Sequence, residues 1–346
     1  TVGHLPGGLG QINVVVSMLF AGVSGSSTAE AAGIGSLMIP AMKKQGYDTS
    51  FTVAITACAA TMGVIIPPSI LMVVWGGLMS VSIGAMFLAG VVPGVMIGLF
   101  LMGTVYVYAK VRRYPVAQRA SAKEFFSALR GAILALITPA IIVGGIVGGF
   151  FTPTEASVIA VLYAAALGGV VYRTLGRKEF GAVLHESARL SAVSLFCIGT
   201  ASAFGWLLAY YRVPQAFVGA LSGWATGPIS AGLLIALAFL IIGCFIDAIP
   251  AIIIMGTILL PLAQNAGMHP IHFALIGVIS LAFGLVTPPY GLCLLIAASI
   301  GQIKVVATLK DVGIILTAML LVLLLVIVFP ELVLFLPRLI APQFVD

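Results

Sequence analysis

Charged side chains are scarce in this sequence, and their scarcity decides the broad class of the protein. Asp, Glu, Lys and Arg make up 8% of the 346 residues, whereas soluble domains carry about 25%. The mean hydropathy of +1.23 leaves too little polar surface to cover a soluble core. The composition therefore excludes a soluble globular domain and predicts a membrane protein.

Two long stretches lack charge altogether. The whole stretch between Asp48 and Lys110, and the whole stretch between Asp247 and Lys304, contain no Asp, Glu, Lys or Arg. One spanning helix needs about 20 apolar residues, so each stretch holds more than one membrane element. Both stretches are continuously apolar rather than alternating, which favours helices over a β-barrel. The sequence thus predicts an all-α polytopic membrane protein.

Cysteine motifs and histidine clusters are also missing. His269 and His272 stand on either side of Pro270, between two apolar stretches, and are expected at the membrane interface. The net charge of +6 is concentrated in a few loops and gives no reason to expect nucleic acid as a partner. No cofactor is expected. The four cysteines form no CxxC pair and are interpreted as packing residues: Cys58, Cys197, Cys244 and Cys293.

Basic residues fix the expected topology. They gather at 110–130 and 173–178, on either side of two apolar stretches near 131–151 and 153–172. Two crossings return the chain to the same face, so both basic loops are expected in the cytoplasm. Thr152-Pro153-Thr154-Glu155 predicts a helix start with a capping box. Further spans are predicted near 84–109, 188–211 and 312–330. The basic residues of the two loops are Lys110, Arg112, Arg113, Arg119, Lys123, Arg130, Arg173, Arg177 and Lys178.

The sequence repeats itself once. The stretch GVIIPPS at 63–69 resembles GLVTPPY at 284–290, an offset of 288 − 67 = 221. A repeat with one offset and no gap indicates two structurally equivalent halves. The same offset makes three further pairs: Pro40 with Pro261, Gly46 with Gly267, and Gly22 with Gly243.

Each half has the same design. An apolar arm leads to a Gly-rich polar tip, at 22–28 or 243–247, and a second apolar arm runs on to Pro40 or Pro261. Such arms are short for a full crossing, which predicts re-entrant helical hairpins at 12–41 and 233–262. The apolar run that follows each hairpin should be broken at Pro67 or Pro288, because Pro removes a backbone donor and clashes with the preceding turn.

The two halves are expected to enter the membrane from opposite faces. The first hairpin ends at Lys43 and Lys44, on the cytoplasmic side, whereas the second follows a loop poor in basic residues. Inverted repeats with broken helices are typical of secondary transporters. Three crossings precede the second hairpin and almost nothing precedes the first, so about 90 residues are expected to be missing at the start.

The repeat predicts four parts. Residues 1–83 hold the first hairpin and broken helix, and residues 229–303 hold the second pair; together they form a predicted transport domain. Residues 84–228 hold scaffold and connecting helices with the cytoplasmic basic loops. Residues 304–346 hold a C-terminal scaffold helix and tail.

The tips and the breaks carry the candidate chemistry. Carbonyl groups freed at a helix break, together with nearby hydroxyl groups, suit a hard cation such as Na⁺, and helix N-termini suit an anionic substrate group. Two simpler alternatives stay open, because Glu30 could complete a capping box with Ser27 and Asp247 could cap the arm that follows it. The predicted Na⁺ ligands are Ser24, Gly25, Ser26, Gly63, Val64, Ile66, Pro67, Gly243, Asp247, Gly284, Val286, Thr287 and Pro288.

A predicted substrate site overlaps this set. Arg212 ends an uncharged run and precedes Val213-Pro214; it could form a two-pronged bond with a carboxylate or could reach out to lipid headgroups. The predicted substrate-binding residues are Ser26, Ser27, Thr28, Ser69 and Arg212.

The stretch GVSGSSTAE at 22–30, with GVIIPPS and GLVTPPYG, resembles the large membrane subunit of TRAP transporters of the dicarboxylate and sialic acid type. The resemblance covers essentially the whole chain. It implies an elevator-type, Na⁺-driven importer of organic acids in the bacterial inner membrane, with no enzymatic activity. It also implies a small four-helix membrane subunit and a periplasmic substrate-binding protein as partners, besides membrane lipid. By the same resemblance, the tips and broken helices form the Na⁺ and substrate sites.

Two other classes of function fit the sequence less well. An intramembrane hydrolase would need a base, yet no His lies within an apolar run near Ser24 or Ser26, and no paired Asp is present to activate water. A passive anion channel is compatible with inverted broken helices, but nothing resembles a selectivity filter.

Overall fold

The structure is a computed structural model that describes residues 2–114, 121–221, 224 and 227–345; Arg119 of the first basic loop lies outside them. All regular structure in these residues is helical. Six of the helices are long and apolar enough to cross a membrane: Ile83–Arg112, Phe126–Val147, Pro153–Val171, Arg177–Tyr210, Ala248–Asn265 and Val305–Val328. Within the described residues, the prediction of an all-α, multi-pass membrane protein is confirmed.

The first part of the chain builds a helix pair and an interrupted helix. Helices α1 (Gly8–Ser24) and α2 (Ser27–Lys44) pack against each other, and only two residues link them. Helix α3 (Thr49–Ala60) continues as the 3₁₀ turn η1 (Thr61–Val64) and then stops. After the cis Pro67-Pro68 bond, α4 (Ile70–Met79) begins, followed by the long α5 (Ile83–Arg112).

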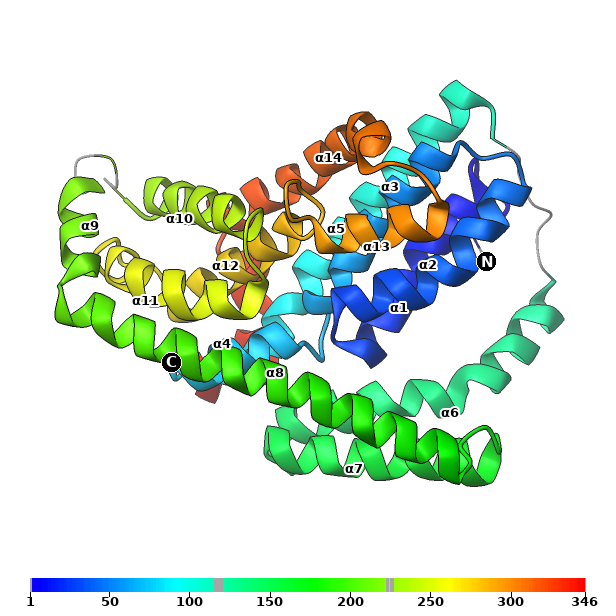
Figure 1. The fold of residues 1–346 in the computed structure, drawn as a ribbon, viewed down its shortest axis with the longest axis horizontal. Coiled ribbons are helices and arrows are strands. Elements are labelled where there is room, and N and C mark those ends of the chain that lie inside the picture. The colour runs from blue at the N-terminus through cyan, green and yellow to red at the C-terminus, as the bar shows by residue number, and fades with distance from the viewer. Residues whose placement is uncertain (1, 115–120, 222–223, 225–226, 346) are drawn as a thin grey trace.

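The middle part forms an arm along one side of the molecule (Figure 1). Helix α6 (Ala122–Val147) pairs with α7 (Pro153–Ala166), which ends in the π-helical turn η2 (Leu167–Val171). The predicted capping box is present, since Thr152 and Glu155 bond each other's backbone N–H groups and Pro153 opens the helix. Helix α8 (Arg177–Tyr210) then runs from α7 to α9 (Val213–Leu221).

The last part has the same order of elements as the first. Helices α10 (Pro228–Gly243) and α11 (Ala248–Asn265) form a second pair, and α12 (Pro270–Gly284) is followed after the cis Pro288-Pro289 bond by α13 (Leu292–Gly301). The turn η3 (Val305–Thr308), α14 (Leu309–Val328), α15 (Glu331–Ile340) and the turn η4 (Pro342–Phe344) complete the chain. Helices α2 and α11 are related by the offset of the sequence repeat, both at their starts (248 − 27 = 221) and at their ends (265 − 44 = 221).

Helices α3 and α12 lie at the centre of the molecule. Every residue of 51–60 and of 271–284 is buried. Helix α13 packs against α2 and α3, so the last part of the chain closes over the first hairpin (Figure 1). In return α11 packs against α4. Each hairpin therefore contacts the short helix that follows the break in the other half.

Two expectations about the arms are wrong in detail. Pro40 and Pro261 lie inside α2 and α11, which run on to Lys44 and Asn265. One proline removes a single backbone bond, and packing on the buried faces of these helices compensates. His272, at the start of α12, is buried, and its Nε2 lies 2.9 Å from the carbonyl oxygen of Val326.

A charged cluster joins the ends of α3, α5 and α14. Arg112 contacts Asp48 at 2.6 Å and Asp311 at 2.9 Å. The buried Asp311 also accepts hydrogen bonds from the hydroxyl groups of Ser50 and Tyr108. Since a buried carboxylate needs a charged partner and further donors, this cluster fixes the three helices relative to one another.

Candidate functional site

The tip of the first hairpin is a link of two residues, Gly25 and Ser26, each with its own role. Gly25 adopts the left-handed conformation at φ +63, which ends α1, and Ser26 caps α2 by accepting a bond from the backbone N–H of Ala29. Glu30 therefore follows the capping position by four residues rather than three, and its carboxylate bonds no backbone group. The capping-box interpretation of Ser27 and Glu30 is wrong.

This tip lies against the chain that follows the first helix break. The backbone N–H of Ile70 donates to the carbonyl oxygen of Gly25 at 3.2 Å. A Cβ on Gly25 would come within 3.0 Å of the carbonyl oxygen of Pro68, so only glycine permits this approach. Ser69 caps α4 and donates its hydroxyl to the carbonyl oxygen of Val64 at 2.6 Å, which spans the break.

The second tip lies against the second break in a comparable way. The backbone N–H of Tyr290 donates to the carbonyl oxygen of Cys244 at 2.9 Å. Asp247 occupies the capping position of α11 but makes no side-chain capping bond, and it is exposed. Thr287 donates its hydroxyl back to Phe283 at 2.9 Å. The Asp247 carboxylate is thus free for a ligand.

The two tips face a common cavity of about 520 Å³. The start of α2 contributes hydroxyl groups, the start of α11 contributes the Asp247 carboxylate, and α8 closes one side. Ser26 and Thr28 place their hydroxyl oxygens 3.1 Å apart at this site. Two helix N-termini therefore meet at one cavity, and their partial positive charge favours an anionic group between them. The residues that line it are Gly25, Ser26, Ser27, Thr28, Ala29, Val64, Ile70, Leu71, Leu190, Val193, Ser194, Asp247, Ala248, Ile249 and Leu285.

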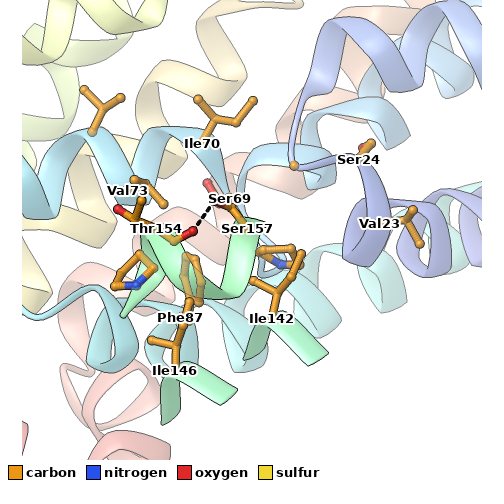
Figure 2. Close-up of a pocket in the computed structure, with 14 residues that line it drawn as sticks. Val23, Ser24, Ser69, Ile70, Val73, Phe87, Ile142, Ile146, Thr154 and Ser157 are labelled. Atoms are coloured by element: carbon orange, nitrogen blue, oxygen red, sulfur yellow. Dashed lines mark hydrogen bonds between the residues drawn. The ribbon is translucent and has the colours of Figure 1, made fainter. Parts of the chain in front are cut away.

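A second cavity, of about 380 Å³, opens on the other side of the first tip. Figure 2 shows Val23 and Ser24 from the end of α1 and Ser69 and Ile70 from the start of α4 at this cavity, facing side chains of α5, α6 and α7. Most of the lining side chains are apolar. This cavity separates the first hairpin from the α6–α7 pair and offers few groups to a charged ligand.

The structure brings together part of the predicted site. Gly25, Ser26, Ser27, Thr28, Val64 and Asp247 line the cavity between the tips. Ser24 and Ser69 line the second cavity instead, and the Ser69 hydroxyl is already bonded. Gly243 and Gly284 are in contact with each other, and Val286 is buried. Gly63 lies beside Ser26, Ile66 packs against Gly94, and the carbonyl of Pro67 and the nitrogen of Pro288 lie near Gly22 and Gly291.

Arg212 lies away from this cavity. It is exposed just beyond the end of α8, in the left-handed conformation at φ 54. Ser194 lines the cavity from the same helix, and the sixteen residues from there to Tyr210 rise about 24 Å. The structure does not bring Arg212 to the tips, so its role in substrate binding stays a prediction.

Sequence reasoning missed the contribution of α8. Leu190, Val193 and Ser194 face the tips from a helix that the sequence predicts only as a connecting span. The spacing of three and four residues is that of one helix face, yet nothing in an apolar span marks which face meets a cavity. Only the polar Ser194 gave a signal.

The available ligand atoms at the tips are oxygens. Among the residues described, no group of three or more His, Cys, Asp or Glu side chains could hold a metal ion. Hydroxyl, carbonyl and carboxylate oxygens suit hard cations rather than transition metals. The oxygen atoms at the tips are therefore of the type that hard cations prefer.

These features define a class: an all-helical, multi-pass membrane protein with a cavity between two hairpin tips, as in transporters. The model of the family described as "Tripartite ATP-independent periplasmic transporter, DctM component" matches residues 1–332, and the chain belongs to this family. It is thus related to the large permease subunits of TRAP transporters, as its sequence motifs predicted.

Relatives named for different substrates are similarly close. The chain is 38% identical to the "Sialic acid TRAP transporter large permease protein SiaM" of Vibrio cholerae, over 98% of this chain and 79% of the relative. It is 38% identical to the "C4-dicarboxylate TRAP transporter large permease protein DctM" of Pseudomonas aeruginosa, over 89% of this chain and 72% of the relative. It is 40% identical to the "Isethionate TRAP transporter permease protein DctMQ" of Oleidesulfovibrio alaskensis, over 96% of this chain and 53% of the relative.

Proposed function

We propose that this protein imports a small organic anion across the bacterial inner membrane, by secondary active transport coupled to Na⁺. The observation that carries the proposal is the cavity where the starts of α2 and α11 meet. Two helix N-termini favour the negative group of the substrate, and the oxygens of the tips and breaks suit the cation. Membership of the TRAP family supports transport of organic acids.

The two hairpin units form an inverted repeat in this proposal. The boundaries of α2 and α11 differ by the same offset, and both hairpins are followed by an interrupted helix. With α1 and α10 as short arms, each hairpin enters the membrane and returns to its own face. We place α11, although long enough to span, in the second hairpin because of its packing against α10.

In this proposal, an elevator movement would carry the two hairpins and their interrupted helices together past the arm formed by α6, α7 and α8. Packing of α5 against α1, α12 and α14 supports counting α5 and α14 with the moving unit, rather than with a scaffold that begins at residue 84 or 304. Helices α6, α7 and α8 bury little of their surface in this chain. They are the natural place for lipid and for a small membrane subunit.

A periplasmic binding protein supplies the substrate in this scheme. The relatives are named for sialic acid, C4-dicarboxylate and isethionate, although each is about 40% identical to this chain or less. We infer that a carboxylate or another small organic acid binds between the tips, with Ser26, Ser27 and Thr28 as donors. The binding protein would select among such acids.

Uptake into proteoliposomes tests the proposal. The large subunit is reconstituted with its small subunit and supplied with its substrate-binding protein and a radiolabelled organic acid. We expect accumulation only when an inward Na⁺ gradient is present. Equal uptake with K⁺ alone would contradict Na⁺ coupling, and downhill flux without the binding protein would indicate a passive channel.

A further inference from the structure

Glu30 is a buried acid without a partner. It lies in the first turns of α2 and has no exposed surface. Neither carboxylate oxygen has a hydrogen-bond partner, and no ion pair found among the described residues includes it. Ser17 of α1 lies close to it, and the Ser17 hydroxyl also lacks a bond of normal geometry. Such a group is strongly disfavoured unless something compensates its charge.

The surroundings of Glu30 are oxygen-rich. A Cβ on Gly63 would lie 2.6 Å from Oε2 of Glu30 and 3.1 Å from the carbonyl oxygen of Ser26. Both oxygens therefore converge on the 3₁₀ turn η1, where the helix is interrupted. The Ser27 hydroxyl donates to the carbonyl oxygen of Thr61 nearby, at 3.4 Å. Converging oxygens repel one another unless a cation lies among them.

Within the part of the chain that the structure describes, no basic side chain pairs with Glu30 to balance its charge. Cys293 of α13, which is fully buried, interacts with Glu30, and the same Cys293 lies near two further groups that bring no positive charge, Cys58 of α3 and Asp247 at the other tip. Lys43 is thirteen residues away along α2, a rise of about 20 Å, and donates to the carbonyl oxygen of Gly301. The compensating charge must therefore come from outside the chain.

The other half has no equivalent of this acid. The offset of the repeat pairs Glu30 with Ala251, and it pairs Ser26 with Asp247. Each hairpin thus carries a single acid, but Asp247 is exposed in the cavity whereas Glu30 is enclosed behind it. The two halves differ in where they hold negative charge.

We propose that Glu30 is the anionic ligand of an enclosed Na⁺ site bounded by α1, the first turns of α2, and η1. The inference rests on the proposed Na⁺ coupling and adds a charged ligand to it. Bound Na⁺ neutralises Glu30, so the buried end of the first hairpin carries an uncompensated charge only when the ion is absent. Moving the first hairpin within the membrane without bound Na⁺ would then cost free energy, because the charge of Glu30 would be uncompensated.

Thermal unfolding of the assembled transporter in detergent tests this without measuring transport. Wild type, Glu30→Gln and the surface control Glu186→Gln are heated at a series of Na⁺ concentrations, with choline as the replacement cation. We expect Glu30→Gln to need at least tenfold more Na⁺ for half of the stabilisation. Without Na⁺, Glu30→Gln should unfold at the wild-type temperature or above, because the amide carries no charge. Glu186→Gln should match wild type throughout.

The outcomes separate this inference from the proposed function. If Na⁺ stabilises wild type and Glu30→Gln alike, the inference is overturned while Na⁺ coupling stands. If Na⁺ leaves wild type unaffected, the proposed coupling itself fails. Should Glu30→Gln not accumulate, Glu30→Asp keeps the charge but shortens the reach, and it too should raise the Na⁺ requirement. An unchanged Na⁺ response in Glu30→Asp, with altered pH dependence, would make a proton the occupant and overturn the inference.

Discussion

Gly243 and Gly284 meet backbone to backbone. A Cβ on Gly284 would lie 2.6 Å from the carbonyl carbon of Gly243 and 2.7 Å from its Cα. The end of α10 therefore rests directly on the end of α12, without an intervening side chain. This contact sets the position of the second tip relative to the second break.

Gly284→Ala should disturb that contact. The added methyl group meets backbone, which cannot turn aside as a side chain can, so we expect a loss of about 1–3 kcal/mol in unfolding free energy. Gly313→Ala in α14 is the matched control, because nothing lies within 4 Å of its Cβ position. It should be neutral or stabilising by up to about 1 kcal/mol. Equal unfolding temperatures for the two variants would show that the contact between Gly243 and Gly284 does not hold the second tip in place.

Arg112→Ala should be destabilising. The change leaves the buried Asp311 carboxylate without its charged partner, and Asp311 keeps only the hydroxyl groups of Ser50 and Tyr108. We expect a loss of about 2 kcal/mol, below the range for fully enclosed pairs because Arg112 is partly exposed. Arg338→Ala is the control, since its pair with Glu331 is exposed and should contribute less than about 1 kcal/mol. Similar losses in thermal unfolding would contradict the assignment.

Tyr114→Phe should change how stability depends on pH. The hydrogen bond from Tyr114, followed by the contacts with Arg112, lowers the pKa of Asp48. Burial and then Asp48 raise the pKa of Tyr114 to about 12. Because the pKa of Asp48 is lower in the folded protein, Asp48 stabilises the fold at pH values above its unfolded-state pKa, near 4. This stabilisation disappears as the pH falls. Because the pKa of Tyr114 is higher in the folded protein, Tyr114 stabilises the fold at pH values below its unfolded-state pKa, near 10. This stabilisation disappears as the pH rises toward 12.

The stability difference between wild type and Tyr114→Phe should therefore be constant between about pH 5 and 9 and shrink on either side. The measurement is the unfolding temperature of both proteins across pH. Tyr106→Phe serves as the control, because its ring can still lie under Lys110. A difference that does not vary with pH would mean that the Tyr114 hydroxyl does not hold Asp48.

Arg212→Lys distinguishes the two interpretations of Arg212. The side chain is exposed beyond the end of α8, about 24 Å of helix rise from Ser194. A headgroup contact needs only positive charge, whereas a carboxylate fork needs the planar guanidinium. We expect the KM for the organic acid to change less than twofold. A tenfold increase would place Arg212 at the substrate during part of the cycle.

Much of the fold could be predicted because membrane constraints are strict. Scarce charge, the Pro-Pro breaks and the basic loops are local signals, and the predicted spans lie within about four residues of α5 and α14. The buried state of Glu30 could not be predicted, because Ser27 and Glu30 have the spacing of a capping box and the shift by one residue at Ser26 is set by the tip geometry. The role of α8 in the cavity depends on tertiary packing alone.

The hydrogen bond from Lys43 to Gly301 joins residues 258 positions apart and ties α2 to α13. During synthesis at about 5–20 residues per second, α2 is made roughly 13–52 s before α13 emerges. The first hairpin must therefore wait in the membrane with its α13-facing side uncovered. An insertion factor or lipid has to shield it for that interval. The order of translation thus leaves this side of α2 without its native partner until α13 has been made.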